Sequence, residues 1–556
     1  MQQERISHGF GPYIDSGSRA LILGSFPSVK SREADFFYGH PQNRFWKVLE
    51  RVFDDNINPV DSTDPGPAGK PALSDGSGRA SVPDAFHTAN NPTAIAAKKA
   101  FLRRHHIALY DVIESCTITG SSDSSIRDVV PADIMGLLSA APIERIFVSG
   151  RTAKKYYDKY LYTLCGQTAV CLPSTSPANA AWSLEKLASE WEIVARPKIR
   201  YVDSPSNFYH DKDTRDGYLV WPEDECTDNT ASASVDASSA DIRSAFKSLP
   251  LIRFHSLDKM GFVDSSFTTR SGGVSRGILG SLNLGFNRGD REDNLRTNWE
   301  RCAAAMDCSL EQMIATDQVH GTEILRAEEG MGLATGLAPA AGSPGMSADG
   351  SAVSALRPGV SGIDGFWCNT PGLTLCASFA DCVPVYLADP VGRRISLVHS
   401  GWKGTVGQIA GKAVRILAGQ GSKPQDIIAV IGPSISGEHY EVTEDVIKAF
   451  REGQIYANGG KTAVTGPGGN TSEIEAPRSA LYTEAELKDI YVQTDRIHYR
   501  LDLWAAIYYT LVHAGVRPEN IHFSGICTWE NADILWSHRR SGGKRGNMNA
   551  FLKIKE

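Results

Sequence analysis

The chain lacks a long hydrophobic run, a cysteine framework and a strong charge of one sign. No apolar run approaches the roughly 18 residues of a membrane-spanning helix, and the first residues lack the basic-then-apolar pattern of a secretory signal peptide. The ten cysteines are scattered, without the spacing of a disulfide scaffold. The formal net charge is only −7 over 556 residues. We therefore expect an intracellular protein, in the cytoplasm or the nucleus, without a membrane partner.

Length and composition indicate more than one globular domain. At 556 residues the chain is long enough for about two to four domains. Residues 224–241 are acidic and rich in Ser and Ala, a composition typical of disorder. We predict a first domain at 8–198 with a low-complexity insertion at about 58–91, a partly disordered linker at 199–250, and a second domain at 251–556.

Three short strings in the second half contain residues that bind zinc. His320 lies in Gln-Val-His-Gly, Cys382 in Ala-Asp-Cys-Val-Pro and His399 in Val-His-Ser-Gly-Trp. A catalytic zinc has three such ligands and one open position, and it lowers the pKa of a bound water to about 7. Cys382 and His399 follow predicted strands at 373–380 and 394–398, and α/β sheets place their sites at strand ends. The strings predict a zinc site, although any one of the three residues alone is more often a core or loop residue.

Further strings in the second half carry a family resemblance. They are Thr-Arg-Ser-Gly-Gly-Val-Ser at 269–275, Ser-Leu-Asn-Leu-Gly at 281–285, Gly432-Pro433 and Tyr440-Glu441-Val442. From about Phe254 onward the chain closely resembles the YfiH family, also called the laccase-domain or polyphenol oxidase family. The resemblance implies an α/β fold and zinc bound by the two histidines and the cysteine. It also implies phosphorolysis of adenosine, inosine or methylthioadenosine, or deamination of adenosine.

Other residues of the second half receive roles from that reading. Arg270 is our candidate anchor for the phosphate co-substrate, because a guanidinium can pair bidentately with phosphate oxygens; a surface ion pair is the ordinary alternative. Asn283 is a candidate contact for the sugar or base. The family tail ends in Thr-Gly-Arg, but the final Arg is Asn547 here, with Arg545 nearby. A polyphenol oxidase or an editor of cell-wall precursors is the alternative function, although a multicopper cluster needs more imidazoles than these strings supply.

Strings in the first half carry a second resemblance. An apolar run at 19–23 leads into a Gly-Ser-Phe-Pro-Ser loop, and apolar runs at 107–113 and 146–150 predict two more strands. A string dense in aromatics and amides follows at 36–46, and Pro-Ser-Thr-Ser-Pro-Ala-Asn lies at 173–179. This half resembles the uracil-DNA glycosylase superfamily, most closely its deoxyinosine (hypoxanthine) DNA glycosylase branch. The resemblance implies a three-layer α/β/α domain with a central parallel sheet.

The first half lacks the carboxylate that many members of this superfamily carry. Ser25 and Phe26 stand where others have an Asp or Asn that positions water. The hypoxanthine branch shares this absence, and the resemblance points instead to Asn43 as the polar group at the scissile bond. An amide has no useful basicity, so Asn43 would orient water and stabilise charge without a metal. A nucleic-acid-binding module without catalysis is the alternative.

Aromatic and small polar residues would contact the nucleic acid. A flipped base can be held by stacking and edge hydrogen bonds, and hydroxyl residues in loops can bind phosphate. We assign base contact to Phe26, Phe45 or Trp46, and backbone contact to Ser174, Ser176 and Asn179. An aromatic core patch is an equally good account of the rings. Any DNA contact needs local clusters of positive charge, and the candidates are Arg44, Lys47, Lys98, Lys99, Arg103 and Arg104.

The sequence thus predicts a bifunctional purine-directed enzyme. The first domain would excise hypoxanthine from DNA, and the second would use zinc for purine nucleoside phosphorolysis or adenosine deamination. The expected partners are DNA for the first domain, and purine nucleosides with inorganic phosphate for the second.

Overall fold

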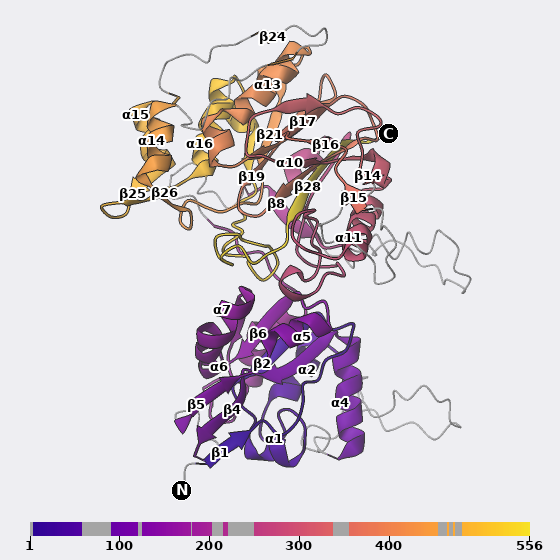
Figure 1. The fold of residues 1–556 in the computed structure, drawn as a ribbon, viewed down its shortest axis with the longest axis vertical. Helices are drawn as coiled ribbons and strands as arrows, with labels where there is room; N and C mark the ends of the chain where they lie inside the picture. The colour runs from indigo at the N-terminus through magenta and orange to yellow at the C-terminus, as the bar shows by residue number, and fades with distance from the viewer. Residues whose placement is uncertain are drawn as a thin grey trace, which may run out of the picture. The chain divides into compact units, whose positions relative to one another are not determined.

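The computed structural model describes residues 4–57, 91–119, 125–179, 181–202, 215–220, 249–336, 355–453, 464–465, 471–472 and 481–556. Most of the predicted insertion at 58–91 and the whole acidic segment at 224–241 lie outside these residues. The chain divides into two compact units, the first comprising 1–198 with 274–281 and the second 199–273 with 282–556 (Figure 1). None of the helices in the described ranges is both long and apolar enough to cross a bilayer.

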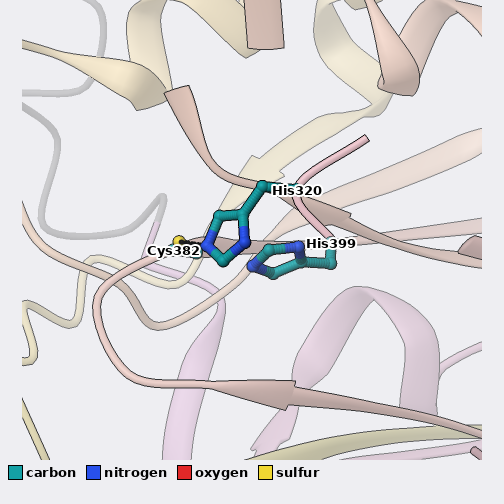
Figure 2. A group of neighbouring side chains, drawn as sticks. All are labelled: His320, Cys382 and His399. Carbon is teal, nitrogen blue, oxygen red and sulfur yellow. Dashed lines mark hydrogen bonds between the residues drawn. The ribbon is translucent and has the colours of Figure 1, made fainter. Parts of the chain in front are cut away.

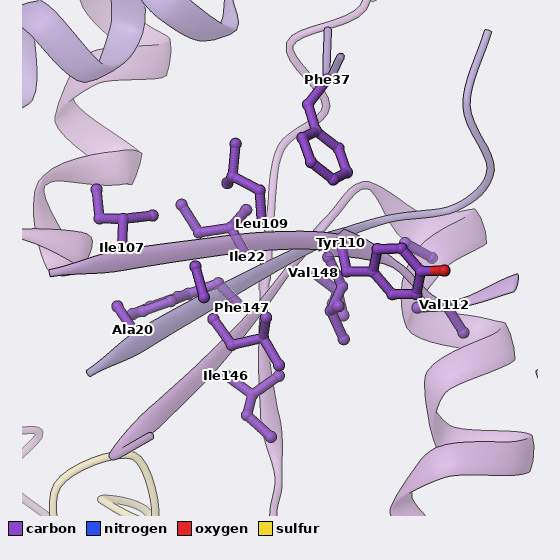
Figure 3. Close-up of a cluster of buried hydrophobic side chains, with 14 of the residues drawn as sticks. Ala20, Ile22, Phe37, Ile107, Leu109, Tyr110, Val112, Ile146, Phe147 and Val148 are labelled. Carbon is purple, nitrogen blue, oxygen red and sulfur yellow. The ribbon is translucent and has the colours of Figure 1, made fainter. Parts of the chain in front are cut away.

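The first unit is built on a four-stranded parallel sheet with the order β3-β2-β6-β7. Its strands are β2 (Ala20–Gly24), β3 (Ile107–Asp111), β6 (Arg145–Ser149) and β7 (Ala169–Leu172). Every residue of β2 and β3 is buried, as expected where helices cover both faces of a sheet. Figure 3 shows their apolar side chains packed together. The strands predicted for this half are confirmed.

Helices complete three α/β/α layers in the first unit, as predicted. They are α1 (Val29–Glu33), α2 (Phe45–Phe53), α4 (Pro92–Arg104), α5 (Ile134–Ala140), α6 (Arg151–Tyr156), α7 (Tyr162–Cys165) and α8 (Leu184–Trp191). Helix α4 begins where Asn91 caps the N–H of Ala94 and Pro92 takes the first turn. A three-stranded antiparallel sheet of β1 (Glu4–Ser7), β4 (Ile113–Ile118) and β5 (Arg127–Pro131) accompanies them.

The strand order of the first unit creates a site for a ligand. The chain passes from β2 to β3 on one side, and then to β6 and β7 on the other side. Strand β2 therefore lies where the order reverses, and the loops after β2 and β6 diverge. In open α/β sheets ligands bind in the crevice at such a point, outside the carboxyl ends of the strands.

The second unit contains two six-stranded mixed sheets. The first has the order β11-β18-β28-β10-β9-β8, with β8 (Gly217–Val220), β9 (Leu251–Phe254), β10 (Val263–Thr268), β11 (Met313–Ile314), β18 (Thr374–Phe379) and β28 (Met548–Ile554). The second has the order β13-β17-β20-β19-β21-β27, with β13 (Ile324–Arg326), β17 (Gly365–Cys368), β19 (Val383–Asp389), β20 (Arg394–Ser400), β21 (Ile428–Ile431) and β27 (Ile521–Phe523). Strand β8 lies within the range predicted as a linker and pairs with β9.

Alternating side chains of β19 show how the layers of the second unit pack. Val385 and Leu387 contact the core beneath the helices, whereas Tyr386 and Ala388 contact the core between the two sheets. The unit is therefore layered as helix, sheet, sheet and helix. The helices that share the core of Val385 and Leu387 are α12 (Trp402–Val406), α13 (Ile409–Gly419), α14 (Glu444–Glu452), α15 (Glu484–Ile490) and α16 (Leu503–His513). Helix α11 (Glu292–Ala305) covers the other sheet.

The strands predicted at 373–380 and 394–398 are confirmed as β18 and β20. Two separate helices follow β20. Helix α12 ends at Val406 and α13 starts at Ile409, because Gln408 has a left-handed backbone with φ +59°. A helix cannot continue through such a residue.

Candidate functional site

The side chains of His320, Cys382 and His399 lie close together in the second unit (Figure 2). One donor atom from each lies within 4.8 Å of the others, and the Cys382 Sγ is 3.8 Å from the His320 Nε2. Within the described ranges, no other group of three His, Cys, Asp or Glu residues is arranged to hold a metal ion. The structure therefore brings together all three residues proposed from the sequence.

Strand geometry explains two of these positions. His399 follows Ile395 and Leu397 in the two-residue alternation of β20, so its ring points to the side occupied by the other sheet. Cys382 precedes β19, after Asp381, whose backbone is left-handed with φ +88°. The Asp381 carboxylate accepts hydrogen bonds from the Thr528 hydroxyl at 2.7 Å and the Arg539 N–H at 2.7 Å. These bonds fix the turn that presents the thiol.

Asp364 connects two of the three candidate ligands. Its carboxylate accepts the N–H of His320 at 3.0 Å and the N–H of Gly321 at 2.7 Å, and it lies 2.9 Å from the His399 Nδ1. Because Nδ1 is bonded to Asp364, the Nε2 of His399 is the nitrogen left for a metal ion. No sequence string had pointed to Asp364.

The thiol and the imidazole shift each other's protonation. Burial opposes ionisation of Cys382, but the charge of His399 and hydrogen bonds from both histidines lower the pKa of Cys382 to about 6. Burial also disfavours the charged form of His399, yet the Cys382 thiolate and Asp364 raise the pKa of His399 to about 9. Both shifts favour the thiolate form of Cys382 and the charged form of His399. A thiolate is the form of cysteine that binds metal ions.

Arg270 and Asn283, proposed as substrate contacts, are both buried. The Arg270 guanidinium lies over the Trp536 ring at 5.3 Å and donates to the Ala532 carbonyl. The Asn283 amide donates to Asp290 at 2.9 Å, and its oxygen accepts the N–H of Gly285 and of Asn547. The contacts of both side chains are to protein groups that hold the surrounding loops.

The first unit contains a cavity of about 600 Å³ at the carboxyl ends of its parallel strands. The loops after β2, β6 and β7 line it, as the strand order leads one to expect. Phe26, Asn43, Ser174 and Ser176 are among the lining residues. Four of the residues proposed for the glycosylase site therefore share one cavity.

Asn43 is held in one orientation by its side-chain oxygen. The Oδ1 accepts the N–H of Phe45 at 3.0 Å and the hydroxyl of Thr175 at 2.9 Å. Within the described ranges no group is bonded to its Nδ2. The amide hydrogens are therefore the part of Asn43 available to a ligand in the cavity.

The cavity also contains a carboxylate that the sequence strings did not reveal. Asp111, at the end of β3, lines it and is bonded through Oδ2 to the buried His8 Nε2 at 2.7 Å. Its Oδ1 accepts no hydrogen bond from the described part of the chain. That oxygen lies over Gly24, where a Cβ would be only 2.1 Å away. The Tyr38 hydroxyl, also buried in the lining, has no hydrogen-bond partner of normal geometry among the described residues, although Ser149 is near.

Two of the proposed base-contacting rings are instead in the core. Phe45 and Trp46 are fully buried in α2; Phe45 stacks on Tyr38 with ring centroids 3.7 Å apart and Trp46 on Phe36. Asn179 donates to the Ser174 carbonyl at 2.8 Å and is not part of the cavity lining.

Two of the cations proposed for DNA contact are also structural. Lys98 is fully buried beneath the Trp46 ring, and the Arg44 guanidinium donates to the carbonyls of Ser176, Asn179 and Trp182. Both residues therefore stabilise the fold of the first unit through contacts within it.

Comparison with known families gives these sites a context. The family model "Multi-copper polyphenol oxidoreductase laccase" matches residues 264–555, slightly more than half of the chain. The chain belongs to this family. The model of the uracil DNA glycosylase superfamily matches residues 11–196. The resemblances to the laccase-domain family and to the uracil-DNA glycosylase superfamily are confirmed.

Three similar proteins cover both units of this laccase-family chain. Purine nucleoside phosphorylase YlmD of Bacillus subtilis is 31% identical over 295 residues, which are 53% of this chain and 89% of that protein. Purine nucleoside phosphorylase of Deinococcus radiodurans is 33% identical over 274 residues, covering 47% and 92% of the two chains. A putative uracil DNA glycosylase from Methanosarcina acetivorans, solved by NMR, is 28% identical over 34% of this chain and 95% of its own, with a TM-score of 0.25. The second unit is thus a member of the purine nucleoside phosphorylase family.

The donors present in this laccase-family chain fit one metal ion. Two imidazoles and one thiolate supply three ligands, whereas a multicopper cluster needs more imidazoles. Asp364 supplies the outer hydrogen bond that metal-bound histidines usually make. The residues are therefore those of a single-ion site.

Proposed function

We propose that the chain is a bifunctional purine-directed enzyme. The domain at 251–556 would cleave purine nucleosides with inorganic phosphate, deaminate adenosine, or do both, using a zinc ion. The domain at 8–198 would excise hypoxanthine from DNA. The convergence of His320, Cys382 and His399 is the observation that supports the first activity, and the Asn43 cavity supports the second.

The three metal ligands and Asp364 have different roles in the proposed zinc site. His320, Cys382 and His399 would hold the ion, which supplies Lewis acidity when bound. Cys382 is ready as a thiolate because its pKa is lowered to about 6. Asp364 fixes the ring of His399 and the loop of His320, so the donors keep their positions before a metal arrives. Zinc suits this mixed nitrogen and sulfur set.

One assay tests the nucleoside activities. Purified chain is incubated with adenosine, inosine or methylthioadenosine, with and without phosphate, while adenine, inosine and hypoxanthine are measured separately. Phosphate-dependent release of free base supports phosphorolysis, and phosphate-independent formation of inosine supports deamination. Oxidation of phenols by a copper-loaded chain, with no nucleoside turnover, would favour the oxidase alternative instead.

The polar groups of the cavity match the edge of hypoxanthine. That base has an N–H donor at position 1 and a carbonyl acceptor at position 6. Asp111 Oδ1 is an acceptor and the Tyr38 hydroxyl is a donor, and neither is bonded elsewhere among the described residues. Adenine has the opposite pattern at these two atoms, so its ring nitrogen would face a carboxylate oxygen. A site built around such hydrogen bonds rejects the mismatched analogue strongly.

Asn43 would act on the bond that breaks. Because its Oδ1 is occupied by Phe45 and Thr175, its free Nδ2 hydrogens would hold a water molecule or stabilise negative charge on the departing base. Phe26, also in the lining, is the ring left to stack on that base.

Oligonucleotides test the excision activity. Wild type and Asp111→Ala are compared on deoxyinosine, deoxyuridine and deoxyadenosine substrates, with abasic sites as the readout. We expect wild type to release hypoxanthine and the variant to lose about tenfold or more, as for a lost hydrogen bond to a charged group. Asp158→Ala removes an exposed carboxylate paired with Lys154 and serves as the matched control. DNA binding by the wild type without any base release would favour the non-catalytic module.

A further inference from the structure

Two arginines in the second unit converge on one acceptor. The Arg288 Nε donates to the Asn547 Oδ1 at 3.1 Å, and the Arg545 Nη1 donates to the same oxygen. The Arg545 Nε also donates to the His538 Nδ1 at 3.3 Å, and its Nη1 to the Gly546 carbonyl at 3.1 Å. Both guanidinium groups therefore lie beside the Asn547 side chain.

Neither arginine has a carboxylate partner among the described residues. The Nη2 of Arg545 and both terminal nitrogens of Arg288 make no hydrogen bond to the residues that the structure describes. Arg545 is nevertheless buried, with only 8% of its surface exposed. Buried charges in proteins are normally paired, because removing an unpaired charge from water costs several kcal/mol. Two neighbouring cations with unused donors therefore lack an anion.

The two arginines lie near the three candidate metal ligands. Arg539 and Arg545 lie on the same loop. The Arg539 backbone N–H donates to the carboxylate of Asp381, the residue directly before Cys382, so this loop contacts the turn that carries Cys382. Burial and the charge of Arg288 lower the pKa of Arg545 to about 10, while the charges of Asp381 and the Cys382 thiolate oppose that shift. Arg545 is bonded to His538, the residue before Arg539, so hydrogen bonds connect its side chain to the turn that carries Cys382.

We infer that Arg288 and Arg545 form the binding site of the phosphate co-substrate next to the metal ligands. Guanidinium groups pair with phosphate oxygens through parallel hydrogen bonds, and three unused N–H nitrogens are available here. The Asn547 Oδ1 accepts hydrogen bonds from both arginines and so keeps their side chains next to each other. This inference rests on the proposed phosphorolysis and takes the anchoring role from Arg270, whose guanidinium lies over Trp536.

The test measures inorganic phosphate binding and nucleoside turnover separately. Binding is followed by calorimetry on the full chain without nucleoside, and the phosphate KM is measured with inosine. Arg545→Met should weaken phosphate binding about 10- to 100-fold, and Arg288→Ala should weaken it about fivefold or more, as charge-assisted hydrogen bonds are lost. The metal content and the nucleoside KM should stay close to wild type.

A neighbouring arginine supplies the matched control. Arg291 is exposed and paired with Asp293 at 2.7 Å, so Arg291→Ala should leave phosphate binding unchanged. Arg545→Lys keeps the charge without the fork and should fall between wild type and Arg545→Met. If Arg545→Met fails to fold, Arg288→Ala, at an exposed position, tests whether phosphate binding depends on this site.

The outcomes separate this inference from the proposed function. Phosphate binding that depends on both arginines, in a chain that cleaves no nucleoside, supports the site and contradicts phosphorolysis. Nucleoside cleavage with an unchanged phosphate KM in Arg545→Met and Arg288→Ala overturns the site and leaves phosphorolysis standing. A wild-type chain that binds no inorganic phosphate at millimolar concentration also overturns it.

Discussion

The two candidate sites differ in what their polar atoms face. In the second unit, the donor atoms of His320, Cys382 and His399 face one another, so a single small cation satisfies them all. In the cavity of the first unit, Asn43, Asp111 and Tyr38 keep their unused atoms in a space of about 600 Å³. Only a ligand with donors and acceptors of its own satisfies those atoms. The arrangement of the polar groups thus distinguishes a site for one ion from a site for an organic ligand.

Removing the Cys382 thiol should distinguish the activities of the two sites most completely. Cys382→Ala should abolish stoichiometric metal binding and nucleoside turnover, because two imidazoles alone do not make a strong site. Hypoxanthine excision should be unchanged. Metal analysis, nucleoside assay and oligonucleotide assay are run on one preparation. Normal zinc content in this variant would show that the site is assigned wrongly.

Asn43→Ala should give the converse result in the first unit. Loss of a group that stabilises charge in the transition state typically lowers the rate by about 10²–10³. We expect that loss in single-turnover hypoxanthine excision, with DNA affinity and nucleoside turnover retained. Full excision activity would remove Asn43 from the proposed chemistry.

Asp364→Asn should have an intermediate effect, because the residue acts through its neighbours. Loss of the outer partner of a metal-bound histidine typically costs about 10- to 100-fold in metal affinity. A competition titration against a zinc chelator measures it. Asp389→Asn changes another buried carboxylate, at the far end of β19, and should leave metal affinity at the wild-type value. Equal affinities for all three proteins would contradict the role of Asp364.

A change of one pH unit should have the smallest effect. Because the pKa of His399 is raised to about 9, a metal ion must displace its proton at neutral pH, and affinity should fall about tenfold per pH unit as pH decreases. Below pH 6 the Cys382 thiolate also takes up a proton, so the decrease should steepen. Calorimetry in buffers of different ionisation enthalpy counts the protons released. Metal affinity that is flat between pH 6 and 8 would contradict this coupling.

The sequence was most informative where one short string contained the chemistry. His320, Cys382 and His399 could be named because each lies in a recognisable string and strand ends are where sites form. Asp364 was missed because Ile-Asp-Gly resembles an ordinary turn, and its three N–H partners come from a loop 43 to 45 residues away. Asp111 was read only as part of a strand, since the sequence does not show that His8 lies opposite.

Residue type alone misled in the opposite direction for the aromatic string. Phe45 and Trp46 have the chemistry to stack on a base, but α2 turns both toward the sheet. The apolar residues at 45, 48, 49, 52 and 53 have the spacing of one buried helix face, and an interpretation by residue type alone overlooked it. Arg44 and Lys98 similarly have charges suited to DNA, yet they bind carbonyls and a ring inside the first unit. Individual strands were predictable from apolar runs and the fold class from the two family resemblances, whereas the direction of individual side chains required the structure.

Gly401 imposes a constraint that the three ligands do not reveal. A Cβ at this position would lie 3.1 Å from the Cys382 Sγ and 3.1 Å from the His320 Cδ2, so alanine would displace them by a few tenths of an ångström. Metal–ligand distances tolerate only about ±0.2 Å. One added methyl group would therefore disturb the proposed metal site while every proposed ligand residue stayed in place. The glycine after Ser400 is thus part of the proposed metal site, although it offers no donor atom.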